Sequence, residues 1–153
     1  MTQEIKLTTD QMRLMSLFQN ITKATARDCV EDEKQNRIIF VVNEGKMGLA
    51  IGKGGSHIKQ LQTKIDRNVE LVEYSDDPTK FLKNILNEKY IIEIKMSERL
   101  DGSQQAIVIV DNSKKGVVVG REGRNAEKAR LLARRYFDIT SVLINSEEIS
   151  LEW

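Results

Sequence analysis

The sequence has little of what metal centres, disulfides and secretion require. It contains one cysteine, Cys29, and one histidine, His57. An internal disulfide and a zinc site of the usual Cys/His kind are therefore excluded, and a catalytic cysteine–histidine pair is not expected. No run of about eighteen apolar residues is present, and residues 1–10 lack the apolar stretch of a secretory signal. We expect a cytoplasmic protein that does not span a membrane and uses no metal or cofactor.

Charge of one sign and aromatic residues are also scarce. The 153 residues include 24 Lys+Arg against 23 Asp+Glu, which gives a net charge of +1, and only 5% are aromatic. With 40% hydrophobic and 31% charged residues, the composition is that of a folded globular protein rather than a disordered chain. The length allows one medium domain or two small ones.

A shift of 68 residues aligns the chain with itself. Residues 46–55 then lie over residues 114–123, so that three glycines and one lysine coincide. The apolar residues 37–42 lie over residues 105–110 in the same register. A fixed offset that preserves both glycines and apolar spacing indicates a duplicated structural unit.

Each copy is expected to contribute the same order of elements. Thr8 and Gln11 suggest a capping box at the start of a first helix, and Asp77 before Pro78 suggests the cap of a later one. The pattern predicts strands at 29–34, 37–42, 69–74, 90–95, 106–111 and 137–144, short helices before each glycine group such as 44–51, and a long helix at 124–135. The order α-β-β-α-α-β, repeated twice, predicts an α+β fold. We expect a first module at 8–76, a second at 77–145 and an acidic tail at 146–153, with the two modules packed as one rigid unit.

The element common to both copies is a G-x-x-G loop between two helices, at residues 52–55 and 120–123. Glycine permits positive φ and close backbone approach, and the N-terminus of the following helix favours a phosphate group. Each loop also contains a cation, Lys53 or Arg121. One such tetrapeptide is more often a tight helix-to-helix turn, but two copies in the same context favour a phosphate clamp.

Positive charge is concentrated around these loops. Residues 44–67 carry a net charge of +3 and residues 112–135 a net charge of +6, so the other 105 residues carry −8. That distribution is typical of a polyanion-binding site. Lys64, Arg134 and Arg135, taken individually, are interpreted as solvated surface charges.

Nucleotide-dependent enzymes do not fit the same residues. A Walker loop needs four residues between its first glycine and Gly-Lys, whereas three separate Gly48 from Gly52. The dinucleotide pattern fails because His57 stands three residues after Gly54. No nucleophile–base arrangement is evident, and Asp77 is better explained as a helix cap than as a catalytic acid. We expect a protein that is not an enzyme.

The polyanion is expected to be single-stranded. No long basic recognition helix or zinc finger is present for a major groove, and too few aromatic residues are available for base-stacking platforms. Base contacts would come from aliphatic groove walls or, alternatively, these residues belong to the core: Met47, Ala50, Ile51, Val118 and Val119.

The loop sequences, Ile51 to Gly55 and Val119 to Asn125, resemble KH modules. The tandem, with the junction at residues 70–78, resembles the paired KH region of the NusA family of transcription factors over residues 8–145. The resemblance implies two type II KH folds that bind single-stranded RNA, the nascent transcript, and act in transcription elongation, pausing or termination. RNA polymerase is a second candidate partner, and a monomer is expected. Bacterial members carry further domains, and this chain resembles the short archaeal form.

Loops and resemblance together predict the RNA-contacting residues. They are Lys46, Ile51, Gly52, Lys53, Gly54, Gly55, His57 and Lys59 in the first module, and Lys114, Gly120, Arg121, Glu122, Gly123, Arg124, Asn125 and Lys128 in the second. For His57, the alternative of a partly exposed helix histidine with no partner is favoured over RNA contact. Because Glu122 is an acid in a phosphate-facing loop, we expect the second loop to clamp RNA less strongly than the first.

Two other functional classes stay open. The first is a ribosome-associated KH protein. The second is a protein-interaction module whose RNA sites are degenerate, which draws on Glu122 and on the overall neutrality of the chain.

Overall fold

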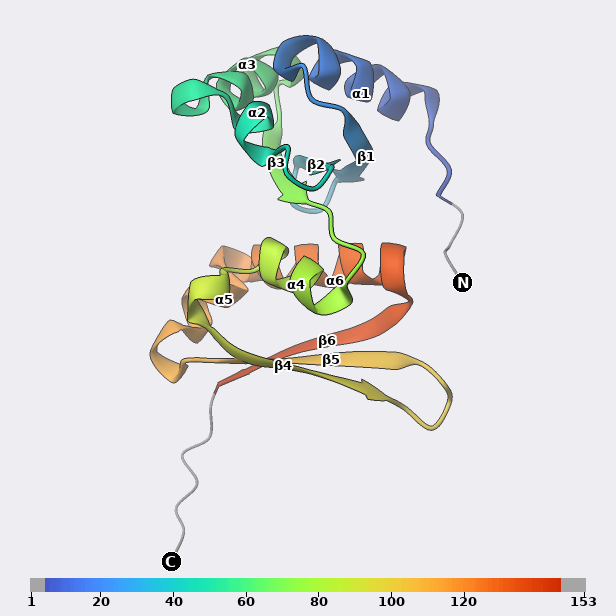
Figure 1. Cartoon of the computed structure of the whole chain (residues 1–153), viewed down its shortest axis with the longest axis vertical. Helices are drawn as coiled ribbons and strands as arrows, with labels where there is room; N and C mark the ends of the chain where they lie inside the picture. Colours follow the sequence, from blue (N-terminus) through green and yellow to red (C-terminus); the bar gives the residue numbers. More distant parts are fainter. Residues whose placement is uncertain (1–4, 147–153) are drawn as a thin grey trace, which may run out of the picture. The chain divides into compact units, whose positions relative to one another are not determined.

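A computed structural model describes residues 5–146 (Figure 1). The chain forms two compact units, of which one contains Lys6–Asp76 and the other contains the described chain from Asp77 onward. In each unit, helices cover one face of a three-stranded sheet (Figure 1). Within residues 5–146, no helix is both long and apolar enough to cross a membrane.

The first unit follows the predicted order of elements. They are α1 (Thr9–Thr22), β1 (Ala26–Asp32), β2 (Arg37–Val42), α2 (Met47–Ile51), α3 (Ser56–Ile65) and β3 (Asn68–Glu73). β2 lies in the centre of the sheet, antiparallel to β1 and parallel to β3. Thr8 and Gln11 form the predicted capping box at the start of α1. The parallel pairing requires α2, the glycine loop and α3 as the crossover, which places the loop at one end of the sheet.

The core of the first unit lies between its sheet and its helices. Phe18 of α1 stacks on Phe40 of β2 with 4.6 Å between ring centroids. Ile38 and Val42 point to the same side as Phe40 because strand residues alternate between faces, and Leu61 of α3 covers them. Cys29 is fully buried in this cluster, as expected for a small apolar strand residue.

The second unit repeats this arrangement. Its elements are α4 (Pro78–Ile85), β4 (Ile91–Glu98), β5 (Gln104–Val110), α5 (Lys115–Val119), α6 (Arg124–Phe137) and β6 (Ile139–Ser146). β5 lies in the centre, antiparallel to β4 and parallel to β6. The Asp77 side chain accepts a hydrogen bond from the Thr79 N–H at 3.0 Å, which confirms the cap and leaves Pro78 at the first helical position.

The α+β order is confirmed, and several boundaries move. β1 begins at Ala26 rather than at residue 29. It includes Asp28, a residue type that is rare in strands. The buried Asp28 carboxylate is satisfied here because it accepts the Cys29 N–H at 2.8 Å. Helix α6 runs two residues past the predicted 135, to Phe137, so β6 begins and ends two residues later than predicted.

The predicted tail at 146–153 overlaps the end of β6. The strand includes Ser146, and residues 147–153 lie outside the described residues. The packing of the two modules as one rigid unit stays a prediction.

Candidate nucleic-acid interface

The two glycine loops have the same backbone conformation. The first positions, Gly52 and Gly120, have φ/ψ of 75°/166° and 83°/164°. The third positions, Gly54 and Glu122, have 64°/22° and 57°/25°, and the fourth, Gly55 and Gly123, have 74°/18° and 73°/16°. Since these angles agree within 10° across the repeat, the sequence match at an offset of 68 reflects a real structural duplication.

Glycine is required at the first position of each loop for two reasons. The φ/ψ values of Gly52 and Gly120 fall in a region that only glycine adopts readily. A Cβ on Gly52 would also lie 2.7 Å from the His57 ring, and one on Gly120 would lie 2.8 Å from the Asn125 side chain. At Gly54, a Cβ would meet nothing within 4 Å. The inner end of the loop is therefore tightly packed and its tip is open to a ligand.

The loop geometry exposes the start of the following helix. The Gly55 N–H bonds to the Gly52 carbonyl at 3.1 Å, and the Gly123 N–H bonds to the Gly120 carbonyl at 3.0 Å. These bonds turn the chain directly into α3 and α6. The N-cap residue of each helix is glycine, which has no side chain to cap the first-turn N–H groups. Those groups can bind an anion together with the positive end of the helix dipole.

His57 and Asn125 brace the loops, which sequence reasoning did not predict. His57 Nδ1 lies 2.8 Å from the Leu49 carbonyl oxygen, and Asn125 Nδ2 lies 3.5 Å from the Val117 carbonyl oxygen. The two pairs are equivalent under the repeat. The alternative of a His57 with no partner is wrong, because its ring joins α3 back to α2. Both side chains contact the backbone of the short helix that precedes the loop.

Most of the predicted cations lie at the surface around the loops. Lys46, Lys53, Lys59 and Arg121 are exposed, and Lys114 and Arg124 are half-buried. Lys114 Nζ lies 5.4 Å from the centroid of the Tyr90 ring. Lys128 differs, since only 8% of it is exposed and it lies among the buried residues of α6. We therefore leave Lys128 out of the proposed contact surface.

The second loop carries an acid where the first has a glycine. Glu122 occupies the position of Gly54 with a positive φ of 57° and is exposed. Asp111, which stands where the first module has Asn43, accepts the Ser113 hydroxyl at 2.8 Å and the Ser113 N–H at 2.9 Å. These bonds lower the pKa of Asp111. The carboxylate is therefore ionised at neutral pH and reduces the positive potential near the second loop.

The aliphatic residues proposed as groove walls separate into two groups. Ala50 and Val118 are fully buried, so the core-packing alternative is correct for them. Met47, Ile51 and Val119 are half-buried. The exposed apolar residues of the short helices are instead Leu49 and Val117, at 45% and 52% exposure. These two occupy equivalent positions, and their carbonyls are the ones that His57 and Asn125 contact.

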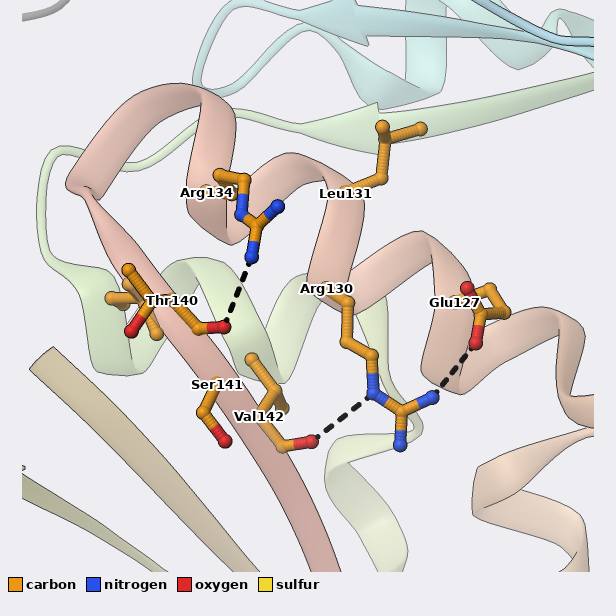
Figure 2. A pocket seen from close by; sticks show the side chains of 8 residues that line it. Glu127, Arg130, Leu131, Arg134, Thr140, Ser141 and Val142 are labelled. Carbon is orange, nitrogen blue, oxygen red and sulfur yellow. Dashed lines mark hydrogen bonds and ion pairs between the residues drawn. The ribbon is translucent and has the colours of Figure 1, made fainter.

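A pocket of about 300 Å³ lies between α6 and the free edge of β6 (Figure 2). Figure 2 shows the guanidinium groups of Arg130 and Arg134 directed at backbone carbonyls of this strand. Arg130 Nε donates to the Val142 oxygen and Arg134 Nη2 to the Thr140 oxygen, both at 3.3 Å. Arg130 Nη1 also pairs with Glu127 Oε1 at 2.9 Å. Arg134 is exposed, which agrees with its interpretation as a surface charge, and the i, i+4 spacing places it on the same helix face as Arg130.

Comparison with known proteins agrees with this architecture. The KH domain family model matches residues 13–99 and again residues 78–153. The probable transcription termination protein NusA of Halobacterium salinarum is 36% identical over 90% of this chain and 96% of its own length. The protein of the same name from Methanocaldococcus jannaschii is 30% identical over 92% of this chain and 75% of its own. The crystal structure of APE1850 has a TM-score of 0.83 and 39% identity, and covers 91% of this chain and 100% of that one.

The chain belongs to the KH domain family, with two copies of the domain in tandem. Within that family it is a NusA-like protein of the short archaeal type. The sequence-based prediction of two tandem KH modules related to the NusA family is thus confirmed.

Proposed function

We propose that the protein binds single-stranded RNA through its two GxxG loops and acts on nascent transcripts as a transcription elongation or termination factor. The observation that carries the proposal is the pair of loops with matching φ and ψ angles, each opening an uncapped helix N-terminus beside an exposed cation, Lys53 or Arg121. Each such loop can hold phosphate groups of a single strand.

Three further facts support this function. The net positive charge gathers in residues 44–67 and 112–135, which include both loops. The archaeal relatives are named as probable transcription termination proteins. The two exposed apolar side chains of the short helices, Leu49 and Val117, lie next to the loops in sequence and suit contact with unpaired bases. RNA polymerase as a partner, a monomeric state and a cytoplasmic location remain predictions.

The first loop is proposed to be the stronger clamp. Gly54 is neutral, whereas its equivalent Glu122 is an acid. An acid at the tip of a phosphate-binding loop repels the ligand that the helix N-terminus attracts.

The test is an anisotropy titration of short single-stranded RNAs with the full chain. The Lys53→Asp/Gly54→Asp double variant should weaken binding by at least about tenfold, and Arg121→Asp by less. The logarithm of the affinity of the wild-type protein should fall with the logarithm of salt concentration, with a slope of about −0.7 per phosphate contacted. Circular dichroism on the same samples establishes that each variant is folded.

Arg13→Asp is a matched control, because Arg13 is an exposed arginine on α1, a helix that neither begins nor ends at a glycine loop. It should change RNA binding much less than Arg121→Asp. Equal losses in both, or unchanged binding in the folded loop variants, would contradict the clamp and favour a protein-interaction module. Co-sedimentation with ribosomal subunits rather than with RNA polymerase would contradict the transcription role while leaving RNA binding intact.

A further inference from the structure

Arg134 lines the pocket between α6 and β6 because the long helix of the second module is extended. Helix α6 has 14 residues and α3 has 10, although both begin directly after their loops. Under the repeat, Arg134 corresponds to Asp66, which in the first module already ends α3 in a left-handed conformation. The extra turn keeps Arg134 on the helix beside the first residues of β6. The second module therefore has a feature that duplication alone does not explain.

The pocket continues the surface of the glycine loop. Arg124 opens α6, and Glu127, Arg130 and Arg134 follow at intervals of three and four residues, so they share one face of the helix. With a rise of 1.5 Å per residue, Arg130 and Arg134 lie about 9 and 15 Å along the axis from Arg124. A strand whose phosphate is held at the loop can therefore place a neighbouring nucleotide over this pocket.

The polar groups of the pocket include both hydrogen-bond donors and acceptors. Each guanidinium has five N–H donors, and the bonds to Val142, Thr140 and Glu127 engage only some of them. The two bonds to strand carbonyls are long, at 3.3 Å. The carboxylate of Glu127 is an acceptor, and the side chain of Leu131, 39% exposed, offers an apolar surface.

Guanine matches this combination best, because uracil offers the single acceptor O4 on that edge and has no equivalent of N7. Guanine presents two acceptors, O6 and N7, to which an arginine binds in a bidentate manner, and its N1–H and N2 amine can donate to a carboxylate. Adenine and cytosine place an exocyclic amine where guanine has O6, so donor would face donor. A bare phosphate is disfavoured because the Glu127 carboxylate would repel it.

We propose that the α6–β6 pocket of the second module binds a guanine base of single-stranded RNA, with Arg130 and Arg134 reading its O6/N7 edge. The proposal rests on the proposed RNA-binding function and adds base specificity to it. The first module, in which Gln62 and Asp66 stand at the positions of Arg130 and Arg134, lacks this arginine pair.

The test uses the full chain and short oligouridines that carry one internal guanosine, adenosine or 7-deazaguanosine. The wild-type protein should prefer the guanosine oligomer over the adenosine one by about tenfold, and 7-deazaguanosine, which lacks the N7 acceptor, should lose most of that preference. Arg130→Lys and Arg134→Lys keep the charge but lose the bidentate fork, so they should reduce the preference while binding to the adenosine oligomer persists. Arg13→Lys is the control, because Arg13 makes a similar exposed i, i+3 ion pair with Asp10.

Three results would overturn the proposal. The first is a wild-type protein with no preference for guanosine, and the second is a preference that survives in the Arg130→Lys/Arg134→Lys double variant. The third is a double variant that binds all the oligomers more weakly by the same factor. If the wild-type protein binds no RNA, the proposed function itself fails, and guanosine monophosphate becomes the probe. In an NMR titration, shifts of the Leu131 and Val142 amides with guanosine monophosphate but not adenosine monophosphate would support the pocket. No shift at these amides would overturn it.

Discussion

The two modules differ most on the sheet face opposite their core helices. In the first module, Arg37 of the central strand is fully buried and pairs with Asp32 at 2.9 Å and with Glu70 at 3.1 Å. In the second module, strand register places Gln105 at the position of Arg37, and Ser97 and Leu143 at those of the two acids. Leu143 is 40% exposed. The first sheet therefore carries a buried charge network on this face, whereas the three equivalent positions of the second sheet carry no charge.

The same fold thus accommodates either charged or uncharged residues at equivalent positions of the sheet face opposite the core helices. What the modules share is the apolar alternation that buries Ile38 and Phe40 in one sheet and Ala106 and Val108 in the other, together with the glycine loop that closes the parallel crossover. These shared features specify the topology. The polar contacts that differ set the stability and the ligand preference of each module.

The largest expected effect follows from removing the central cation of this network. Arg37→Met should lower the free energy of unfolding by about 3 kcal/mol, because two acids lose their buried counter-ion. The value lies at the lower end for a buried pair, since the side chains of Asp32 and Glu70 keep 13% and 22% exposure. Urea unfolding followed by circular dichroism measures the change. Gln105→Met, at the equivalent position, should change it by less than about 0.5 kcal/mol. Equal effects at both positions would show that the network contributes nothing of its own.

The glycine positions provide the next comparison, within one loop. Gly52→Ala should destabilise the protein by about 2 kcal/mol, because the new Cβ would collide with the His57 ring in a region of φ/ψ that only glycine favours. Gly54→Ala should cost about 1 kcal/mol, since its φ is positive but the space around it is open. Gly120→Ala should match Gly52→Ala. Urea unfolding measures the free energy of unfolding of each variant. A smaller decrease for Gly52→Ala than for Gly54→Ala would contradict the close packing around the first loop position.

The bracing contact from α3 to α2 should contribute about 1 kcal/mol. His57→Ala removes the hydrogen bond to the Leu49 carbonyl, whereas His57→Asn introduces the residue that the second module uses at this position, Asn125. We expect the alanine variant to be less stable than the asparagine variant in thermal unfolding. The RNA affinity of the asparagine variant should stay close to that of the wild-type protein. A large loss of affinity in a folded His57→Asn protein would instead show that His57 contacts RNA directly.

The features that both modules share could be predicted from the sequence, whereas the contacts that depend on exact loop geometry, or that occur in one module alone, could not. Glycines and β-branched strands recur at a fixed offset, so both loops and the order of elements follow from pattern alone. The partners of His57 and Asn125 do not, because a hydrogen bond eight residues back depends on the exact turn of the loop. The arginine pocket was missed because α6 is four residues longer than α3, an insertion that ends the simple alignment where Arg134 stands.

The smallest effect concerns the tip of the second loop, where Glu122 is the one loop residue with both a positive φ and a side chain. Glu122→Gly should raise the affinity for single-stranded RNA by about threefold at low salt, the scale of one exposed charge, and bring the second loop closer to the first. Glu122→Gln removes the charge but keeps a side chain of the same size at a positive φ. It therefore separates the effect of the charge on RNA affinity from the effect of the backbone conformation. If repulsion limits the second loop, both variants should gain affinity, and the gain should shrink as salt is added. A gain in the glycine variant alone would instead assign the weakness of the loop to its left-handed backbone, and a loss in both would show that Glu122 assists the ligand. Gly54→Glu in the first loop is the reciprocal change, and it should lower the affinity by a similar factor.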